Sequence, residues 1–156
     1  MKKQTGFTLI ELVVVIVILG VLAAIAIPRL ITIERESRIA VLDASRSALR
    51  SATTMVYATQ ATNGLFGAND PADVDGDGAA DINTRGGYPR ATEANLVPLF
   101  EDLSDRYTFN GGGNGDAATI EMRLDGIDEC EVRYTAADIS GGGRVAAFTA
   151  IEDSGC

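Results

Sequence analysis

The chain has 156 residues, a formal net charge of −9 and 46% apolar residues, which suffices for one compact domain with an extension but hardly for two domains. A polyanion repels nucleic-acid phosphates, which argues against a nucleic-acid-binding module. The chain contains no histidine, so the usual serine and cysteine triads would lack their base, and no phosphate-cradling glycine motif is present. We therefore expect no enzymatic activity.

The N-terminal segment joins a short basic stretch, residues 1–6, to a long apolar run. From Phe7 to Ile27, 18 of 21 residues are apolar. As a helix this run spans about 31 Å, roughly one hydrocarbon core. Lys2 and Lys3 precede the run and should hold that end in the cytoplasm, so the rest of the chain would lie across the membrane.

Three interpretations fit such a run. The first is a cleaved signal peptide, with Ala24–Ala26 as a small-residue cleavage site. The second is an ordinary single-pass anchor, which gives Glu11 no purpose. The third begins from the cost of placing Glu11 in the apolar zone, roughly 2.5–3.5 kcal/mol. Cleavage after Gly6 would expose an amine on Phe7, and this amine could pair with Glu11 of a neighbouring copy. A polymer thus explains the glutamate.

The same residues resemble a known family. Gly6–Leu12, the apolar stretch Val13–Ile27 and Pro28 closely resemble the N-terminal signature of type IV pilins and the related pseudopilins. The resemblance covers about the first thirty residues. It implies that a prepilin peptidase cleaves between Gly6 and Phe7 and methylates the new amine.

The resemblance also implies how the subunits assemble. Glu11 and the Phe7 amine would recognise each other between subunits, with Thr8 supporting the polar contact, and the stretch from Gly20 to Pro28 would lose helicity in the filament. The expected partners are identical subunits, the prepilin peptidase and an inner-membrane assembly platform. The precursor would lie in the inner membrane with its head in the periplasm, and the assembled fibre would be extracellular.

An amphipathic helix is predicted for residues 29–59. Charged residues cover much of its surface, and apolar residues recur at spacings of three and four. We expect this apolar stripe to form one wall of a globular head: Val41, Leu42, Ala48, Leu49, Ala52, Met55 and Val56.

Residues 60–156 are predicted to form the globular α/β head. Residues 92–103 are weakly helical, although Pro98 shifts the first true turn towards itself. Alternating patterns predict strands at residues 120–124, 130–135, 145–151 and 107–109, and Gly86–Pro89 marks a turn. The expected fold class is α+β: a long N-terminal helix packed on an antiparallel sheet of about four strands, as in pilins.

Cys130 and Cys156 are the two cysteines of the chain. In an exported protein they most simply form one disulfide, and two free thiols are the alternative. Pilin heads commonly close a C-terminal loop in this manner, so the resemblance extends to the pair.

The segment Asp73–Gly78 matches the first half of a calcium loop, with carboxylates at alternate positions and glycine at the sixth. Beyond Asp73, Asp75 and Asp77, Ala79 would supply a backbone carbonyl and Asp81 a ligand through water. Thr84 stands where the usual bidentate glutamate is expected. The alternative is a solvated acidic turn. Calcium would be a weakly bound ion rather than a required cofactor.

The function predicted from these features is that of a structural pilus subunit for adhesion or surface colonisation. The tripeptide Gly87-Tyr88-Pro89 after an Asp-rich loop is similar to pilins of the mannose-sensitive haemagglutinin group. The first alternative is a type II secretion pseudopilin. The second is a secreted or membrane-tethered calcium-binding domain that never polymerises.

Overall fold

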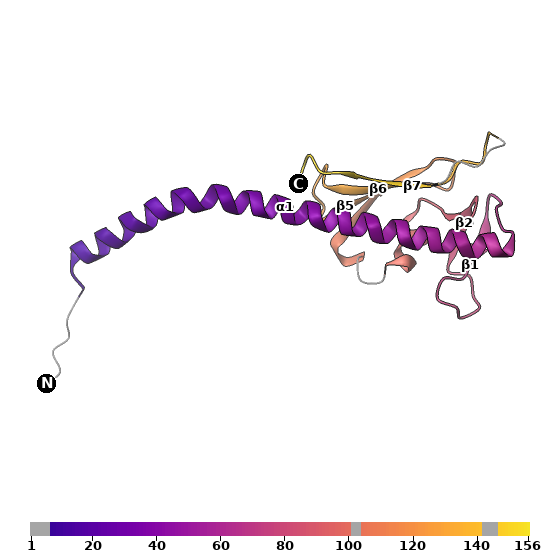
Figure 1. Cartoon of the computed structure of the whole chain (residues 1–156), viewed down its shortest axis with the longest axis horizontal. Helices are drawn as coiled ribbons and strands as arrows, with labels where there is room; N and C mark the ends of the chain where they lie inside the picture. Colours follow the sequence, from indigo (N-terminus) through magenta and orange to yellow (C-terminus); the bar gives the residue numbers. More distant parts are fainter. Residues whose placement is uncertain (1–6, 101–103, 142–146) are drawn as a thin grey trace. The chain divides into compact units, whose positions relative to one another are not determined.

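The computed structural model describes residues 7–100, 104–141 and 147–156. Its first element is a single helix, α1, which runs from Leu9 to Asn63 (Figure 1). The chain divides into two compact units, Met1–Ser37 and Arg38–Cys156. The division falls within α1, so each half of the helix is described with its own unit.

In the first unit, every described residue of α1 up to Glu36 is solvent-exposed. Strongly apolar side chains are bare along this whole stretch, for example Leu19 at 58% and Leu22 at 57% of their surface. Pro28 lies inside the helix, where its ring removes one backbone N–H donor. The hydroxyl of Thr32 donates to the Pro28 carbonyl at 3.2 Å.

In the second unit, one face of α1 is buried at intervals of three and four residues, as expected of a helix packed on a sheet. The buried residues are Leu42, Ser45, Leu49, Thr53, Val56 and Gln60. Half of these buried residues, which we call the seam, are polar. The predicted stripe was therefore wrong at Ala48, which is exposed, and at Met55, which is 74% exposed. The helix also continues four residues past the predicted end at Thr59.

Buried polar groups in the seam are satisfied by partners far along the chain. The Ser45 hydroxyl lies 2.6 Å from the Tyr107 hydroxyl. The Gln60 amide donates to the Thr84 hydroxyl at 2.8 Å and to the Pro71 carbonyl at 3.0 Å. These bonds compensate the desolvation that burying a polar side chain would otherwise cost.

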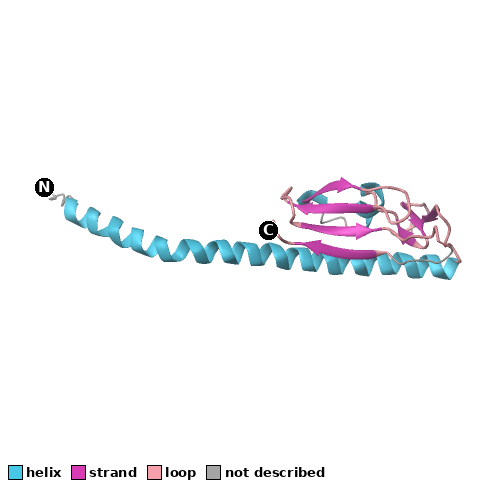
Figure 2. Cartoon of the chain, turned by 90° about the horizontal axis from the view of Figure 1, so that it is seen from above, coloured by secondary structure: helices cyan, strands magenta, loops and turns pink. Residues whose placement is uncertain are grey.

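A four-stranded antiparallel sheet covers the C-terminal half of α1 (Figure 2). Its order is β4-β5-β6-β7, which confirms the predicted sheet. The bounds are β4 Tyr107–Gly111, β5 Thr119–Leu124, β6 Glu131–Thr135 and β7 Phe148–Glu152. Met122 pairs with Val132 in the register, and these inward side chains share one buried core with Leu42 and Leu49. Residues 145 and 146, predicted to begin the last strand, lie outside the described residues.

A second, three-stranded sheet was not predicted. It consists of β1 Asp70–Ala72, β2 Ile82–Arg85 and β3 Tyr88–Pro89, all antiparallel neighbours. The predicted turn at Gly86–Pro89 is thus shorter, because only Gly86 and Gly87 connect β2 to β3. Strands of two to four residues are too short to show an alternating pattern in the sequence.

The segment between the sheets contains short helical pieces. α2 covers Glu93–Leu96, and the 3₁₀ turns η1 and η2 cover Val97–Leu99 and Ser104–Arg106. The single helix expected over residues 92–103 is therefore broken at Val97, where Pro98 enters the first turn of η1 and cannot donate an α-helical hydrogen bond. Residues 101–103 lie outside the described part of the chain.

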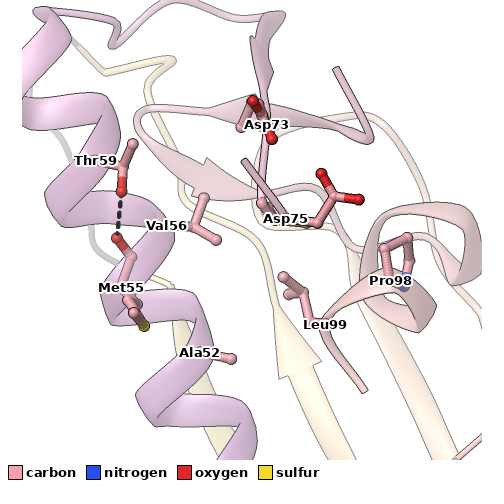
Figure 3. A pocket seen from close by; sticks show the side chains of 10 residues that line it. Ala52, Met55, Val56, Thr59, Asp73, Asp75, Pro98 and Leu99 are labelled. Atoms are coloured by element: carbon pink, nitrogen blue, oxygen red, sulfur yellow. Dashed lines mark hydrogen bonds between the residues drawn. The ribbon is translucent and has the colours of Figure 1, made fainter. Parts of the chain in front are cut away.

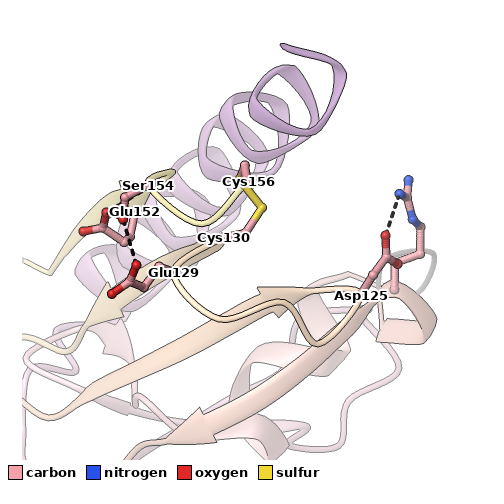
Figure 4. Close-up of a disulfide and its surroundings, with 7 residues drawn as sticks. Asp125, Glu129, Cys130, Glu152, Ser154 and Cys156 are labelled. Atoms are coloured by element: carbon pink, nitrogen blue, oxygen red, sulfur yellow. Dashed lines mark hydrogen bonds and ion pairs between the residues drawn. A yellow bond between two sulfur atoms is a disulfide. The ribbon is translucent and has the colours of Figure 1, made fainter. Parts of the chain in front are cut away.

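Cys130 and Cys156 form a disulfide, as the sequence indicated, at a sequence separation of 26 (Figure 4). Cys130 precedes β6 and is completely buried. Cys156 follows β7 after the turn Asp153–Gly155. The bond therefore joins β6 and β7 at the end of the pair where β6 begins and β7 ends. The Ser154 hydroxyl, which hydrogen-bonds Glu152 at 2.7 Å, lies in the same turn.

Candidate functional site

The start of α1 brings together the residues predicted to direct assembly. Thr8 immediately precedes the helix, and Glu11 is its third residue. The Glu11 carboxylate accepts from the Thr8 backbone N–H at 2.9 Å and from the Thr8 hydroxyl at 2.7 Å. The Glu11 backbone N–H donates back to the Thr8 hydroxyl at 3.4 Å. Phe7, next to this pair, is 86% exposed. Gly6 lies outside the described residues.

This reciprocal arrangement is a capping box, in which Thr at the N-cap and Glu at the third helical position satisfy each other's backbone donors. The sequence reasoning missed it, although Thr-x-x-Glu before an apolar run is its signature. The capping box gives Glu11 hydrogen-bond partners within a single chain. It supplies no positive charge, so the carboxylate still lacks a counter-ion in the described residues of this helix turn.

The apolar stretch after the capping box has no cover within the described residues. α1 contains an 18-residue window apolar enough to cross a membrane, and none of that window is buried. A buried core helix would give the opposite result. The helix is therefore suited to an apolar environment that other molecules supply.

Gly20 and Pro28 both weaken this part of the helix. A side chain added at Gly20 would meet nothing within 4 Å, so packing inside the chain does not require glycine there. Glycine and an internal proline each lower helix stability. Along Leu9–Asn63 the helix is nevertheless continuous.

The acidic loop, Asp73–Asp81, connects β1 to β2. Asp73, Asp75 and Asp81 each offer a carboxylate oxygen, and these oxygens lie within 4.8 Å of one another. Backbone N–H groups of Gly76 and Gly78 donate to Asp73 at 2.6 and 2.9 Å, and these bonds lower the pKa of its carboxyl. Gly76 and Gly78 have φ values of 85° and 91°, which glycine adopts without strain.

The remaining predicted ligands lie outside this three-carboxylate cluster. The Asp77 carboxylate accepts from the Ala79 backbone N–H at 2.7 Å instead. Thr84 is completely buried in β2, where its hydroxyl donates to the Asp70 carbonyl at 3.0 Å. The position that usually holds a bidentate glutamate therefore faces the protein interior and supplies no ligand.

The comparisons with known proteins concern the N-terminal segment. The family model of the prokaryotic N-terminal methylation motif matches residues 1–27. The type IV narrow pilus major component PilA5 of Thermus thermophilus is 53% identical over 50 residues, 32% of this chain and 43% of that protein. The type II secretion system core protein G of Pseudomonas aeruginosa is 39% identical over 54 residues, 35% of this chain and 38% of that protein.

A fimbrial protein of Pseudomonas aeruginosa is 69% identical over 29 residues, 19% of each chain. No solved structure matches the chain significantly. The matched part spans less than half the length of these relatives. Their names are those of pilus, fimbrial and secretion-system components, in agreement with the expectation that the chain is not an enzyme.

The segment that matches the N-terminal methylation motif also contains the start of the exposed apolar helix, whose length and composition would allow it to cross a membrane. These matches support the resemblance of the N-terminal segment to type IV pilins and pseudopilins. The fold, a long N-terminal helix with an antiparallel sheet on the C-terminal half, agrees with that resemblance.

Proposed function

We propose that the chain is the structural subunit of a type IV pilus that serves adhesion or surface colonisation. The precursor lies in the inner membrane with its head in the periplasm. A prepilin peptidase removes residues 1–6 and methylates Phe7. With an inner-membrane platform, the mature subunits then polymerise into an extracellular fibre. In domain terms, residues 7–28 are the polymerisation helix, residues 29–59 an amphipathic helix and residues 60–156 the head.

One observation carries this proposal: an apolar helix without cover holds a single acid at its very start. A lipid bilayer covers the apolar side chains of the precursor, but outside the cell only other copies of the helix can do so. The same packing brings the Phe7 amine of one copy to Glu11 of another, which gives the carboxylate the counter-ion that the capping box lacks. Thr8 then fixes the carboxylate in place for that contact.

Gly20 and Pro28 support the same proposal. Gly20 has open space around it in the single chain, and an internal proline weakens the helix. Both residues are expected where a helix must loosen between Gly20 and Pro28 when it packs among its copies.

The N-terminus of the mature protein tests the processing step. Mass spectrometry of the protein from membranes or fibres should find a chain that begins with methylated Phe7. A chain that begins at Ile27 would instead establish an ordinary signal peptide, and a chain that retains residues 1–6 in functional fibres would contradict the proposal.

A type II secretion pseudopilin is the second candidate, favoured by the similarity to two core G proteins of type II secretion systems. The two roles differ in what a cell loses when the gene is deleted. A pilus subunit is required for surface fibres in which this polypeptide is the main component, whereas a pseudopilin is required for protein secretion. Within the pili, the Gly87–Pro89 tripeptide is the basis for proposing the mannose-sensitive haemagglutinin group.

We also propose that the acidic loop binds calcium through Asp73, Asp75 and Asp81, with Asp77 and the Ala79 carbonyl as further oxygen ligands. The convergence of three carboxylates within 4.8 Å supports the site, because like charges at this distance repel without a cation. The missing twelfth ligand predicts weak binding, about 10⁻⁴–10⁻³ M. A membrane-tethered calcium-binding domain would need the same loop but no filament.

Thermal unfolding tests the calcium site. At a free calcium concentration ten times the dissociation constant, binding should stabilise the head by about 1.4 kcal/mol. Asp75→Asn should reduce this gain, and magnesium at the same concentration should give less of it. An unchanged midpoint between calcium and chelator would leave the loop as a solvated turn.

A further inference from the structure

Arg50 is the one arginine in the described part of the second unit whose guanidinium has no hydrogen bond or ion pair. Arg38 has an interaction of its own, and Arg90 donates to the Ala68 carbonyl. The other described arginines of this unit all pair with carboxylates: Arg46, Arg85, Arg106, Arg123 and Arg133. Residues 38–156 contain 9 arginines and 19 acidic residues. Arg50 is exposed, so its charge is accessible from outside the unit.

Arg50 lines a groove of about 320 Å³ between α1 and the start of β7. We call this hollow the Arg50 groove; its walls include Thr54 of α1, Tyr88 of β3, and Phe148 and Thr149 of β7. Phe148 is 57% exposed, one of the largest bare apolar side chains of the unit. The groove thus combines a free cation, hydroxyls and an exposed aromatic ring.

The acidic loop lies on the opposite flank of the same helix. Ala52, Val56 and Thr59 face Asp73 and Asp75 across a second groove of about 470 Å³ (Figure 3). Successive helical residues turn by about 100°, so Ala52 is about 200° around the axis from Arg50. In Figure 1, β1, which leads into the loop, and β7 likewise lie on opposite sides of α1.

No basic side chain among the described residues pairs with the acidic loop. Among the described residues, neither Asp73 and Asp75 nor Asp77 and Asp81 form an ion pair; their hydrogen bonds are to backbone N–H groups of the loop. Asp75 and Asp77 are exposed. The unit therefore carries an unpaired cation on one flank and unpaired anions on the other.

We propose that the Arg50 groove of one copy receives the acidic loop of a second copy. Because the two surfaces lie on opposite flanks, the contact is heterologous, and a heterologous contact repeats from copy to copy as a filament requires. Each contact offsets part of the repulsion between acidic heads and fixes their register. The inference rests on the proposed function, since it concerns neighbours within the fibre.

Charge reversal in the full chain, expressed in the cell that assembles the fibre, tests this contact. Arg50→Glu and Asp77→Lys each place like charges opposite one another, and each should lower the yield of sheared filaments about ten-fold or more. The double variant should recover much of that loss, because it restores an opposite pair. Asp77 is chosen because it lies outside the three-carboxylate cluster; since it is also a proposed calcium ligand, all filament yields are compared at one fixed calcium concentration.

Arg106→Glu is the matched control. It changes the net charge as Arg50→Glu does, but Arg106 pairs loosely with Asp125 of its own chain, at 3.7 Å and with both side chains 53% exposed. This variant should assemble at nearly the wild-type yield. Thermal unfolding of all variants verifies that the heads fold, so that a loss of filaments reports the contact.

The outcomes separate this inference from the proposed function. Wild-type chains that never form filaments would contradict the proposed function, and the inference would fall with it. Wild-type filaments together with single reversals that assemble as well as Arg106→Glu would overturn the inference alone. Failure of the double variant to recover would overturn it too, because a direct pair must be exchangeable.

Discussion

Residues 9–37 and residues 38–63 belong to one helix but differ in what covers their apolar side chains. In the first stretch every residue is exposed, although the stretch is almost wholly apolar as far as Ile27. In the second, a buried residue recurs every three or four positions, and half of these are polar. The apolar stretch is thus exposed all round, whereas the stretch of mixed polarity is buried along one face. The first half therefore leaves apolar surface for other molecules to cover, whereas one face of the second half is covered by its own chain.

Leucine-to-alanine substitutions in the two halves should differ in their effect on the stability of the head. Leu49 is completely buried, so Leu49→Ala should lower the free energy of unfolding of the head by about 3–5 kcal/mol. Leu19 is 58% exposed, and Leu19→Ala should leave head unfolding in detergent unchanged. Chemical denaturation followed by tyrosine circular dichroism measures both. Equal destabilisation by the two variants would remove the distinction between the halves.

The disulfide should stabilise only the second unit. The loop closed by Cys130 and Cys156 spans 26 positions, and removing such a cross-link costs roughly 3–4 kcal/mol in the chain-entropy account. The double variant Cys130→Ser/Cys156→Ser should therefore unfold at lower temperature but insert into membranes as the wild type does. Reductant should lower the midpoint of the wild type and leave that of the double variant unchanged.

A smaller change in the stability of the second unit is expected when the pH is lowered. The Arg85 guanidinium, and secondarily the Ile139 backbone N–H, lower the pKa of the Asp116 carboxyl. A lowered folded-state pKa contributes stability that is complete above the ordinary pKa of aspartate and is lost as the pH falls through the folded value. Asp116→Asn should therefore make the free energy of unfolding of the head depend less on pH in the acid range. Membrane insertion of the first unit should not change.

Much of the fold could be predicted because its elements are long enough to show their period. The apolar run and the four strands from Tyr107 to Glu152 each repeat a pattern that the sequence displays. The three-stranded sheet could not be predicted, since its strands are too short. Burial of Ser45 and Gln60 was also hidden, because it depends on Tyr107 and Thr84, partners more than twenty residues away along the chain.

The candidate site was predictable in composition but not in geometry. The spacing of Thr8 and Glu11 contains the capping box, which a search for helix start signals would have found. In the acidic loop, the sequence suggests equal roles for Asp75 and Asp77, and both carboxylates accept from a backbone N–H, yet only Asp75 lies in the three-carboxylate cluster. Local hydrogen bonds of this kind depend on the conformation of the loop, which alternating aspartates and glycines do not determine.

The proposed assembly depends on the charge of Glu11. Because Glu11 and Thr8 form a capping box, substitutions can change this charge and the hydrogen bonds of the capping box separately. Glu11→Gln retains a residue that can cap the helix but removes the charge, whereas Thr8→Ala removes the hydroxyl cap and retains the charge. Glu11→Ala removes the charge together with the hydrogen bonds that the carboxylate accepts from Thr8. All three variants should still insert into the membrane, and the Glu11 variants should do so at least as well as the wild type.

The most direct measurement is the filament yield of Glu11→Gln, scored by electron microscopy of sheared fibres against the amount of protein in the membrane. We expect normal membrane levels with fibres nearly absent, because no carboxylate meets the Phe7 amine of the next subunit. Fibres at the wild-type yield would contradict it, since capping alone would then explain why a glutamate stands in the apolar run.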